Sequence, residues 1–198
     1  MTPDIRICFV GDSFVNGTGD ETALGWVGRL CAAACQSGTP MTYYNLGVRR
    51  DTSRDLRERW HTECARRLPS GCDGRVVFSC GVNDTMIENG QPRVGFEESL
   101  DNLRALLKGA SRHKVLLVGP PPVADAQHNT RIQRLAEAYA REAANLNVSC
   151  IDVLGALAAD ADYQRAIMCG DGAHPNGVGY ARMAALIGAH PAWWFHGA

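Results

Sequence analysis

Short apolar runs alternate along the chain with longer stretches in which apolar residues recur every three or four positions. The short runs are typical of buried strands, which they predict at residues 5–10, 41–46, 75–79, 114–118 and 148–151. The longer stretches predict helices near residues 24–36, 53–68, 93–111, 129–146 and 177–190, with a short helix near 153–162. Strands that alternate with helices in this way predict a parallel sheet with helices on both faces.

Length, charge and cysteine content narrow the class of protein. A chain of 198 residues without internal repeats or linkers predicts a single domain over residues 1–198. A net charge of −1 gives no support for a nucleic-acid partner, and the lack of an apolar run of about 18 residues predicts no membrane-spanning helix. The first residues lack the basic end and apolar core of a signal peptide, so we expect a cytoplasmic protein without stable membrane anchoring. The eight cysteines show no zinc-ligand spacing, so we expect reduced thiols and no metal site.

Polar and glycine-rich segments gather where the strands are predicted to end. The letters "GDS" follow the first strand at 11–13, "NLG" closes the second at 45–47, and "GVND" follows the third at 81–84. Ligands of parallel sheets bind beyond the carboxyl ends of the strands, so these segments predict a binding or catalytic site at that edge. An acid and a serine directly after a buried strand indicate either a tight turn or a nucleophile.

The chain also holds the other groups that a serine nucleophile needs. Serine reacts only when a base accepts its proton, and His174 lies three residues after Asp171 in a glycine-rich loop that can bring acid and imidazole together. The oxyanion of the transition state needs N–H donors. Gly47 offers an unhindered backbone amide, Asn83 a side-chain amide, and Ser13 a backbone amide at the start of a helical turn.

Four segments resemble the sequence blocks of the SGNH/GDSL hydrolase family: "GDSF" at 11–14, "NLG" at 45–47, "GVND" at 81–84 and "DGAHPN" at 171–176. The resemblance implies a flavodoxin-like three-layer α/β/α sandwich with a five-stranded parallel sheet. It implies a serine esterase or lipase that cleaves a small or medium acyl ester of a small-molecule substrate through an acyl-serine intermediate, without metal or cofactor. It assigns Ser13 as nucleophile, His174 as base and Asp171 as its partner, and it assigns Gly47 and Asn83, with the Ser13 amide, to the oxyanion hole.

Two arginines follow the second block, where they are expected near the mouth of the site. Arg49 or Arg50 is a candidate to hold an anionic or polar group of the substrate. The alternative is that they form salt bridges with Asp51 or Asp55.

Further residues have open roles. Pro121 and Val123, after the fourth strand, are candidate walls of an acyl pocket, and the alternative is that they only stiffen their loop. Asp12 and Asp84 have no step in the proton transfers, so we expect structural hydrogen bonds to nearby loop amides. The aromatic tail at 193–195 is expected to fold back on the core, with a homodimer contact as the alternative.

Two other functions compete with ester hydrolysis. The same acyl-enzyme could transfer its acyl group to an acceptor other than water, and the sequence does not separate these two reactions. A non-catalytic ligand-binding domain on a flavodoxin-like fold is the third hypothesis, and the intact set of serine, acid and histidine argues against it.

Overall fold

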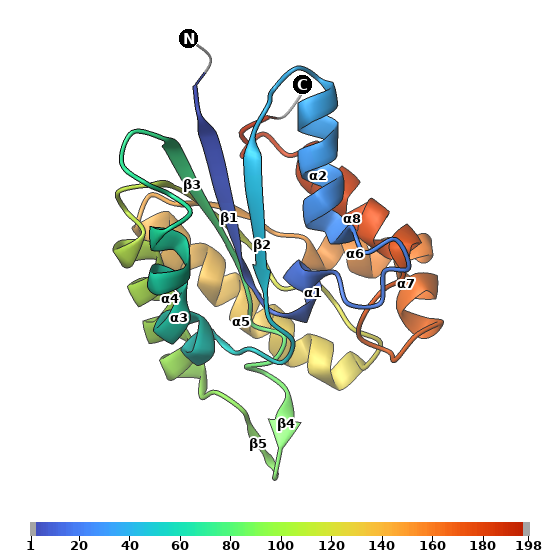
Figure 1. Cartoon of the computed structure of the whole chain (residues 1–198). Coiled ribbons are helices and arrows are strands. Elements are labelled where there is room, and N and C mark those ends of the chain that lie inside the picture. The colour runs from blue at the N-terminus through green and yellow to red at the C-terminus, as the bar shows by residue number, and fades with distance from the viewer. Residues whose placement is uncertain (1–2, 196–198) are drawn as a thin grey trace.

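Five parallel strands form the central sheet in the order β2-β1-β3-β6-β7 (Figure 1), and the computed structural model describes residues 3–195. The strands are β1 (Ile5–Gly11), β2 (Thr42–Gly47), β3 (Asp73–Ser79), β6 (Lys114–Val118) and β7 (Ser149–Ile151). Gly11 at the end of β1 is in register with Gly47 on one side and Ser79 on the other. The three loops that carry the first three sequence blocks therefore leave the sheet at the same level.

Helices cover both faces of the sheet, as the sequence predicts (Figure 1). One layer contains α3 (Ser53–Ala65), α4 (Phe96–Gly109) and α5 (Ala126–Asn145). The other contains α2 (Gly25–Gln36), α6 (Leu154–Ala159), α7 (Ala161–Met168) and α8 (Gly177–Gly188). The single turn α1 (Ser13–Asn16) follows β1 at the sheet edge. The predicted α/β/α architecture is confirmed.

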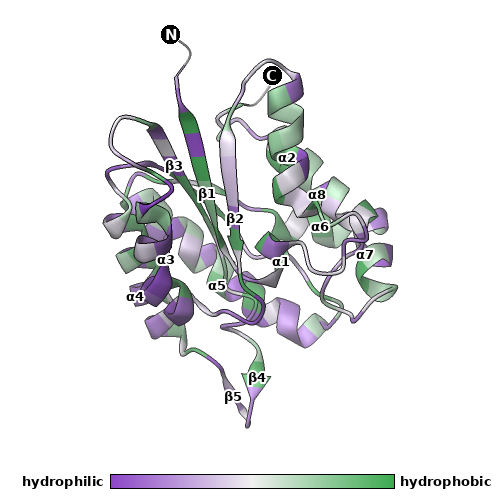
Figure 2. Ribbon diagram, viewed as in Figure 1, coloured by the Kyte–Doolittle hydropathy of each residue, from purple (hydrophilic) through white to green (hydrophobic). Residues whose placement is uncertain are grey.

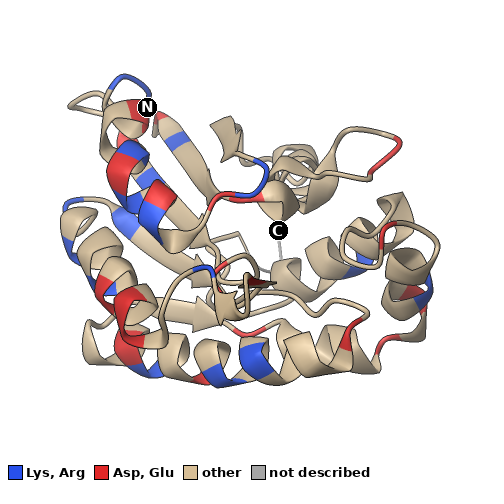
Figure 3. Cartoon of the chain, turned by 90° about the horizontal axis from the view of Figure 1, so that it is seen from below, with Lys and Arg blue, Asp and Glu red and all other residues tan. Residues whose placement is uncertain are grey.

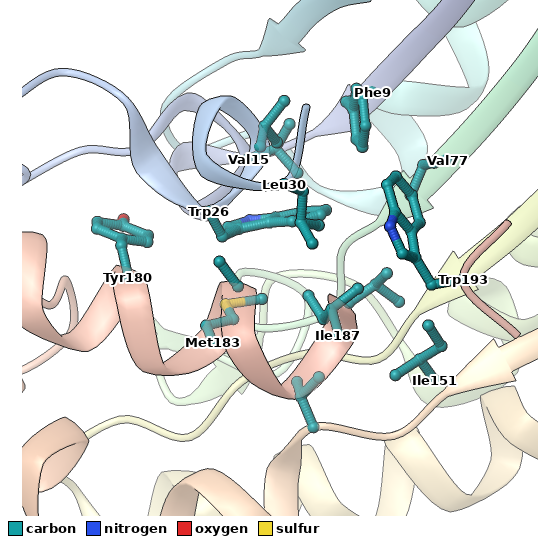
Figure 4. Packing of buried hydrophobic residues seen from close by; sticks show 14 of the residues in the cluster. Phe9, Val15, Trp26, Leu30, Val77, Ile151, Tyr180, Met183, Ile187 and Trp193 are labelled. Atoms are coloured by element: carbon teal, nitrogen blue, oxygen red, sulfur yellow. The ribbon is translucent and has the colours of Figure 1, made fainter. Parts of the chain in front are cut away.

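The alternation of side chains along β1 builds two separate cores. Ile7 and Phe9 pack with α2 and α8, whereas Cys8 and Val10 pack with α3, α4 and α5. Figure 2 shows that β1 is largely hydrophobic and that the edge strand β2 is not. This agrees with burial, because most residues of β1 are buried and most residues of β2 are more exposed. In Figure 4, Trp26 lies between the sheet and α8, and its ring meets Phe9 edge-on at 5.6 Å between centroids. Burial of these large side chains fixes the sheet on which the loops are mounted.

The boundaries of several elements differ from the predicted ones. The hairpin β4 (Ile87–Glu88) and β5 (Gln91–Pro92) projects beyond the carboxyl ends of the strands, and strands of two residues carry no recognisable periodicity. Helix α4 therefore begins at Phe96 rather than near residue 93. Helix α5 begins at Ala126, because Asp125 accepts the His128 amide as its N-cap. The predicted short helix near 153–162 is two helices, since Asp160 ends α6 and caps α7.

The tail folds back on the core at the end of the sheet opposite the hairpin (Figure 1). Trp193 is buried in the cluster with Phe9, and the Arg75 guanidinium lies over the rings of Trp194 and Phe195, at 5.2 and 4.8 Å from their centroids. This packing confirms the expected fold-back. All eight cysteines are free thiols. Over residues 3–195, no helix has the length and apolar character to cross a membrane.

Candidate active site

The first block forms a tight strand-to-helix turn that holds Ser13 at the rim of the sheet. Asp12 caps α1, and its Oδ1 accepts the Phe14 amide at 2.9 Å. A Cβ at position 11 would lie 2.3 Å from the Ser79 carbonyl oxygen, so only glycine lets β1 end this close to β3. Ser13 is the first residue of α1, and its amide is one of those that a helix start leaves without an intrahelical acceptor.

Ser13, His174 and Asp171 lie in one hydrogen-bonded series. His174 Nε2 is 2.7 Å from Ser13 Oγ, and His174 Nδ1 is 2.7 Å from Asp171 Oδ2. Asp171 Oδ1 accepts the amides of Ala173 at 3.0 Å and of His174 at 2.8 Å, so the loop curls around its own carboxylate. Partial burial opposes ionisation of Asp171, but the His174 amide and ring and the Ala173 amide together lower its pKa to about 2. The carboxyl group of Asp171 is thus ionised at neutral pH.

The loop that carries His174 is held on several sides. The Phe14 ring packs on the imidazole with 5.1 Å between centroids. The Ala124 amide donates to the Gly172 carbonyl at 2.7 Å, which ties the loop after β6 to this one. Gly19 has φ 92°, and a Cβ there would lie 3.0 Å from the Pro175 carbonyl oxygen. These contacts orient the imidazole before any substrate binds.

Gly47 is required for close packing, and its amide is already engaged. A Cβ at this position would lie 2.1 Å from the Asn16 nitrogen, inside the backbone of α1. The Gly47 amide donates to Asn45 Oδ1 at 3.0 Å, and Asn45 Nδ2 donates in turn to the Val15 carbonyl at 2.7 Å. The structure therefore gives no support to Gly47 as an oxyanion donor. Its lack of a side chain has a different reason, the close approach of β2 to α1.

Asn83 lies against the loop that follows β2. Its Nδ2 donates to the Asp51 carbonyl at 2.9 Å, which engages one of its two N–H groups and leaves the other. The neighbouring Asp84 is fully buried, with Oδ1 accepting the Ser53 amide at 2.7 Å and Oδ2 accepting the Tyr139 hydroxyl at 3.2 Å. These bonds, with the cap made by Asp12, confirm the structural role expected of the two acids.

The chain matches the GDSL-like Lipase/Acylhydrolase family over residues 9–182. The chain belongs to this family. Among curated proteins, no sequence relative is found.

Solved structures resemble this GDSL-family chain over nearly its whole length. A lipase/acylhydrolase from Enterococcus faecalis has a TM-score of 0.78 and 25% identity, covering 92% of this chain and 93% of its own. An alpha/beta hydrolase enzyme from the metagenome of Lake Arreo, Spain, has a TM-score of 0.80 and 22% identity, covering 100% and 99%. An acetylxylan esterase from Geobacillus stearothermophilus, studied as a catalytic mutant, has a TM-score of 0.75 and 18% identity, covering 94% of each. The last two likenesses show the shared fold.

Arg50 pairs with a partner that the sequence of this GDSL-family chain does not reveal. Its guanidinium is 2.5 Å from Glu88 on the hairpin, and not beside Asp51 or Asp55 as the alternative supposed. Its backbone is left-handed, with φ 70°, and its carbonyl accepts Arg93 Nη1 at 2.8 Å. Arg50 thus forms a salt bridge, as the alternative expected, but with Glu88 and not with Asp51 or Asp55. The hairpin that carries Glu88 was not predicted.

The other candidate substrate contacts remain predictions. Arg49 is exposed, and within residues 3–195 no carboxylate oxygen lies within 4.0 Å of its guanidinium. Pro121 and Val123 are buried, and the Asn129 side chain bonds both the amide and the carbonyl of Val123, at 2.8 and 2.7 Å. The loop after β6 is therefore firmly fixed. Over the same described residues, no cluster of His, Cys, Asp and Glu side chains is placed to hold a metal ion.

Sequence reasoning missed the contacts that fix the Asn83 loop from the side of α5. His128 places Nε2 3.0 Å from both the Val82 carbonyl and Thr85 Oγ1. Arg131 Nε donates to the Thr85 carbonyl at 2.9 Å. Burial lowers the pKa of His128, which favours its neutral form. More than forty residues separate these partners, and no local pattern in the sequence indicates such a pairing.

Proposed function

We propose that the chain is a serine ester hydrolase that cleaves small or medium acyl esters through an acyl-enzyme on Ser13. The observation that carries the proposal is the hydrogen-bonded series from Ser13 Oγ through the His174 ring to the Asp171 carboxylate, with 2.7 Å at each step. A neutral imidazole in this position accepts the serine proton as Oγ attacks the ester carbonyl carbon. Asp171 holds the ring in the tautomer that leaves Nε2 free and stabilises the imidazolium that forms.

The reaction then proceeds in two halves. The tetrahedral intermediate collapses as His174 gives its proton to the leaving alcohol, and the acyl group stays on Ser13 Oγ. A water molecule enters, and His174 accepts its proton as the water oxygen attacks the acyl carbonyl carbon. The second tetrahedral intermediate collapses with cleavage of its bond to Ser13 Oγ, His174 returns the proton to Oγ, and the carboxylic acid leaves. Each intermediate carries an oxyanion that needs N–H donors aimed at one point.

The free amides near Ser13 support a revised set of oxyanion donors. In the loop after β2, the amides of residues 47, 48, 51, 52 and 53 all donate to acceptors within the protein. Within residues 3–195, the amides of Arg49 and Arg50 have no acceptor. Arg50 directly precedes Asp51, whose carbonyl binds Asn83. We therefore include the Arg50 amide, in place of that of Gly47, with the Ser13 amide and Asn83 Nδ2.

The side chains around the imidazole favour a short acyl group. Phe14, Val82 and Val123 are 2%, 5% and 3% exposed and pack together, with Ala173 against them. Phe14 also packs on the His174 ring, so this side of the site leaves little depth for a long acyl chain. The likeness to an acetylxylan esterase is in keeping with an acetyl or similar short group, while Arg49 remains available for a polar or anionic part of the alcohol.

Hydrolysis of p-nitrophenyl esters from acetate to decanoate, by the wild type and Ser13→Ala in parallel, tests the proposal. We expect turnover that is fastest with the shortest esters, falls with chain length and disappears in Ser13→Ala. Equal rates in the two proteins would refute the nucleophile. A rate that rises with chain length would refute the short acyl site while leaving the serine mechanism in place. Adding an alcohol acceptor and measuring the ester formed separates hydrolysis from acyl transfer.

A further inference from the structure

The guanidinium of Arg59, on α3, contacts two of the segments that build the site. Its Nη2 donates to the Gly11 carbonyl at 2.9 Å, and its Nε donates to Asp51 Oδ2 at 2.6 Å. A third contact, from Nη1 to Glu63 at 3.2 Å, holds the side chain along its own helix. The Arg59 and Asp51 side chains are only 19% and 14% exposed, so this ion pair lies beneath the loops rather than in open solvent.

Each of the two contacted segments is linked to a residue of the proposed mechanism, one to Ser13 and the other to Asn83. Gly11 is two residues before Ser13, and its carbonyl also accepts the Val48 amide at 3.0 Å. The carbonyl of Asp51 accepts Asn83 Nδ2 at 2.9 Å. Hydrogen bonds therefore link the nucleophile turn to Arg59, Arg59 to the Asp51 side chain, and the Asp51 backbone to Asn83.

We infer that Arg59 is a positioning residue that sets the separation between the Ser13 nucleophile and the Asn83 amide. The inference rests on the proposed function and adds a residue to it. A guanidinium presents its N–H groups in a rigid planar fork, so its contacts to the Gly11 carbonyl and the Asp51 carboxylate fix two segments at once. A lysine ammonium keeps the charge but cannot hold both directions in the same geometry.

Arg59→Lys tests this role, and Arg57→Lys is its matched control. Arg57 is on the same helix, but its Nη1 contacts Asn102 Oδ1 on α4 at 3.2 Å and not the Gly11 carbonyl or the Asp51 carboxylate. Because a misplacement of about 1 Å can cost about 100-fold in rate, we expect Arg59→Lys to lower kcat by about 10- to 100-fold while KM changes little. Arg57→Lys should retain the kcat of the wild type. Urea unfolding of each variant at the assay pH verifies that the protein measured is folded.

A comparison in the Asn83→Ala background separates a positioning role of Arg59 from a general loss of structure. If Arg59 acts by placing Asn83 relative to Ser13, Arg59→Lys should cost less than about threefold in kcat when Asn83 is already replaced by Ala. An equal loss in both backgrounds, or an unchanged kcat in Arg59→Lys alone, would overturn the inference. Where turnover in the Asn83→Ala background is too slow, the rate of Ser13 labelling by a fluorophosphonate gives the same comparison.

If Arg59→Lys does not fold, Asp51→Ala breaks the same bridge from its other end and should give the same loss in kcat, whereas a wild-type kcat in that variant would overturn the inference. If the wild type has no Ser13-dependent turnover, the proposed function fails and the inference with it. Ser13-dependent turnover that is indifferent to Arg59 overturns the inference alone.

Discussion

The buried carboxyl group of Asp12 predicts an unusual dependence of stability on pH. Asp12 is 2% exposed, and burial, with the nearby carboxylates of Asp84 and Asp51, raises its pKa from 3.8 to about 7 despite the hydrogen bond from the Phe14 amide. Between these two values the unfolded chain has lost the proton and the folded chain still holds it. The folded state therefore binds more protons at Asp12, and the contribution of Asp12 to the free energy of unfolding falls as the pH rises.

The size of this change in the free energy of unfolding follows from the pKa shift of Asp12. Each pH unit in this window costs about 1.4 kcal/mol, and a window of about 3 units gives a total on the order of 4 kcal/mol. Asp12→Asn removes the titration but retains a side-chain oxygen that can accept the Phe14 amide, since asparagine and aspartate are comparable N-caps. The stability of the variant relative to the wild type should thus increase by about 1.4 kcal/mol per pH unit from about pH 4 to about pH 7 and then level off.

Urea unfolding of both proteins at half-unit steps from pH 4 to pH 8 measures this difference. Groups such as Asp171, whose pKa is lowered to about 2, lose their contribution only at lower pH, as the pH falls through that value. They are also present in both proteins, so they cancel in the comparison. Parallel stability curves for Asp12→Asn and the wild type across this range would refute the raised pKa and the burial argument behind it.

Three further predictions concern single side chains. Gly47→Ala should abolish turnover and lower stability, because its Cβ would lie 2.1 Å from a backbone nitrogen of α1. Gly155→Ala is the control, because a Cβ there has open space around it, and it should change neither property in the same circular dichroism and kinetic assays. Asp171→Asn should lower kcat less than His174→Ala on the same ester, because the amide oxygen can still accept from Nδ1, and equal losses would contradict this. Trp193→Ala should lower the free energy of unfolding in urea by about 3–5 kcal/mol while the kcat of the folded enzyme stays unchanged, since this side chain lies far from the site.

Periodicity predicted the scaffold well because its elements are long and their burial is regular. The fourth strand at 114–118 agrees with the structure, and the others differ by one or two residues at their ends. Periodicity missed strands that are too short to show a pattern, and it missed a helix start whose N-cap lies before the periodic stretch. The hairpin strands have two residues each, and α5 begins three residues before its predicted start because Asp125 supplies the cap. Asn129, at the predicted start, binds the Val123 backbone, a contact that no helix signal could indicate.

The sequence blocks indicated which segments meet but not what each residue does there. The parallel sheet brings Ser13, after β1, to the edge where the other strands end, and this topology could be predicted from the alternation of elements. Asp171 and His174 reach the same edge on the loop between α7 and α8, which follows the last strand through two helices. Gly47 shows the limit of the same reasoning. A glycine in a block was assigned to hydrogen bonding, yet its position is explained by the backbone of Asn16 at 2.1 Å from where a Cβ would stand.

The contacts that fix the distances within the site come from residues that belong to no block. His128 and Arg131 hold the Asn83 loop from α5, and Arg59 holds the nucleophile turn and Asp51 from α3. In the sequence, each looks like an ordinary polar position on a solvated helix face. Their roles arise only when α3 and α5, which belong to the same helix layer, pack against the loops at the carboxyl ends of the strands. Because acyl transfer is sensitive to displacements of the order of 1 Å, substitutions of these three residues should alter kcat as strongly as many changes within the blocks themselves.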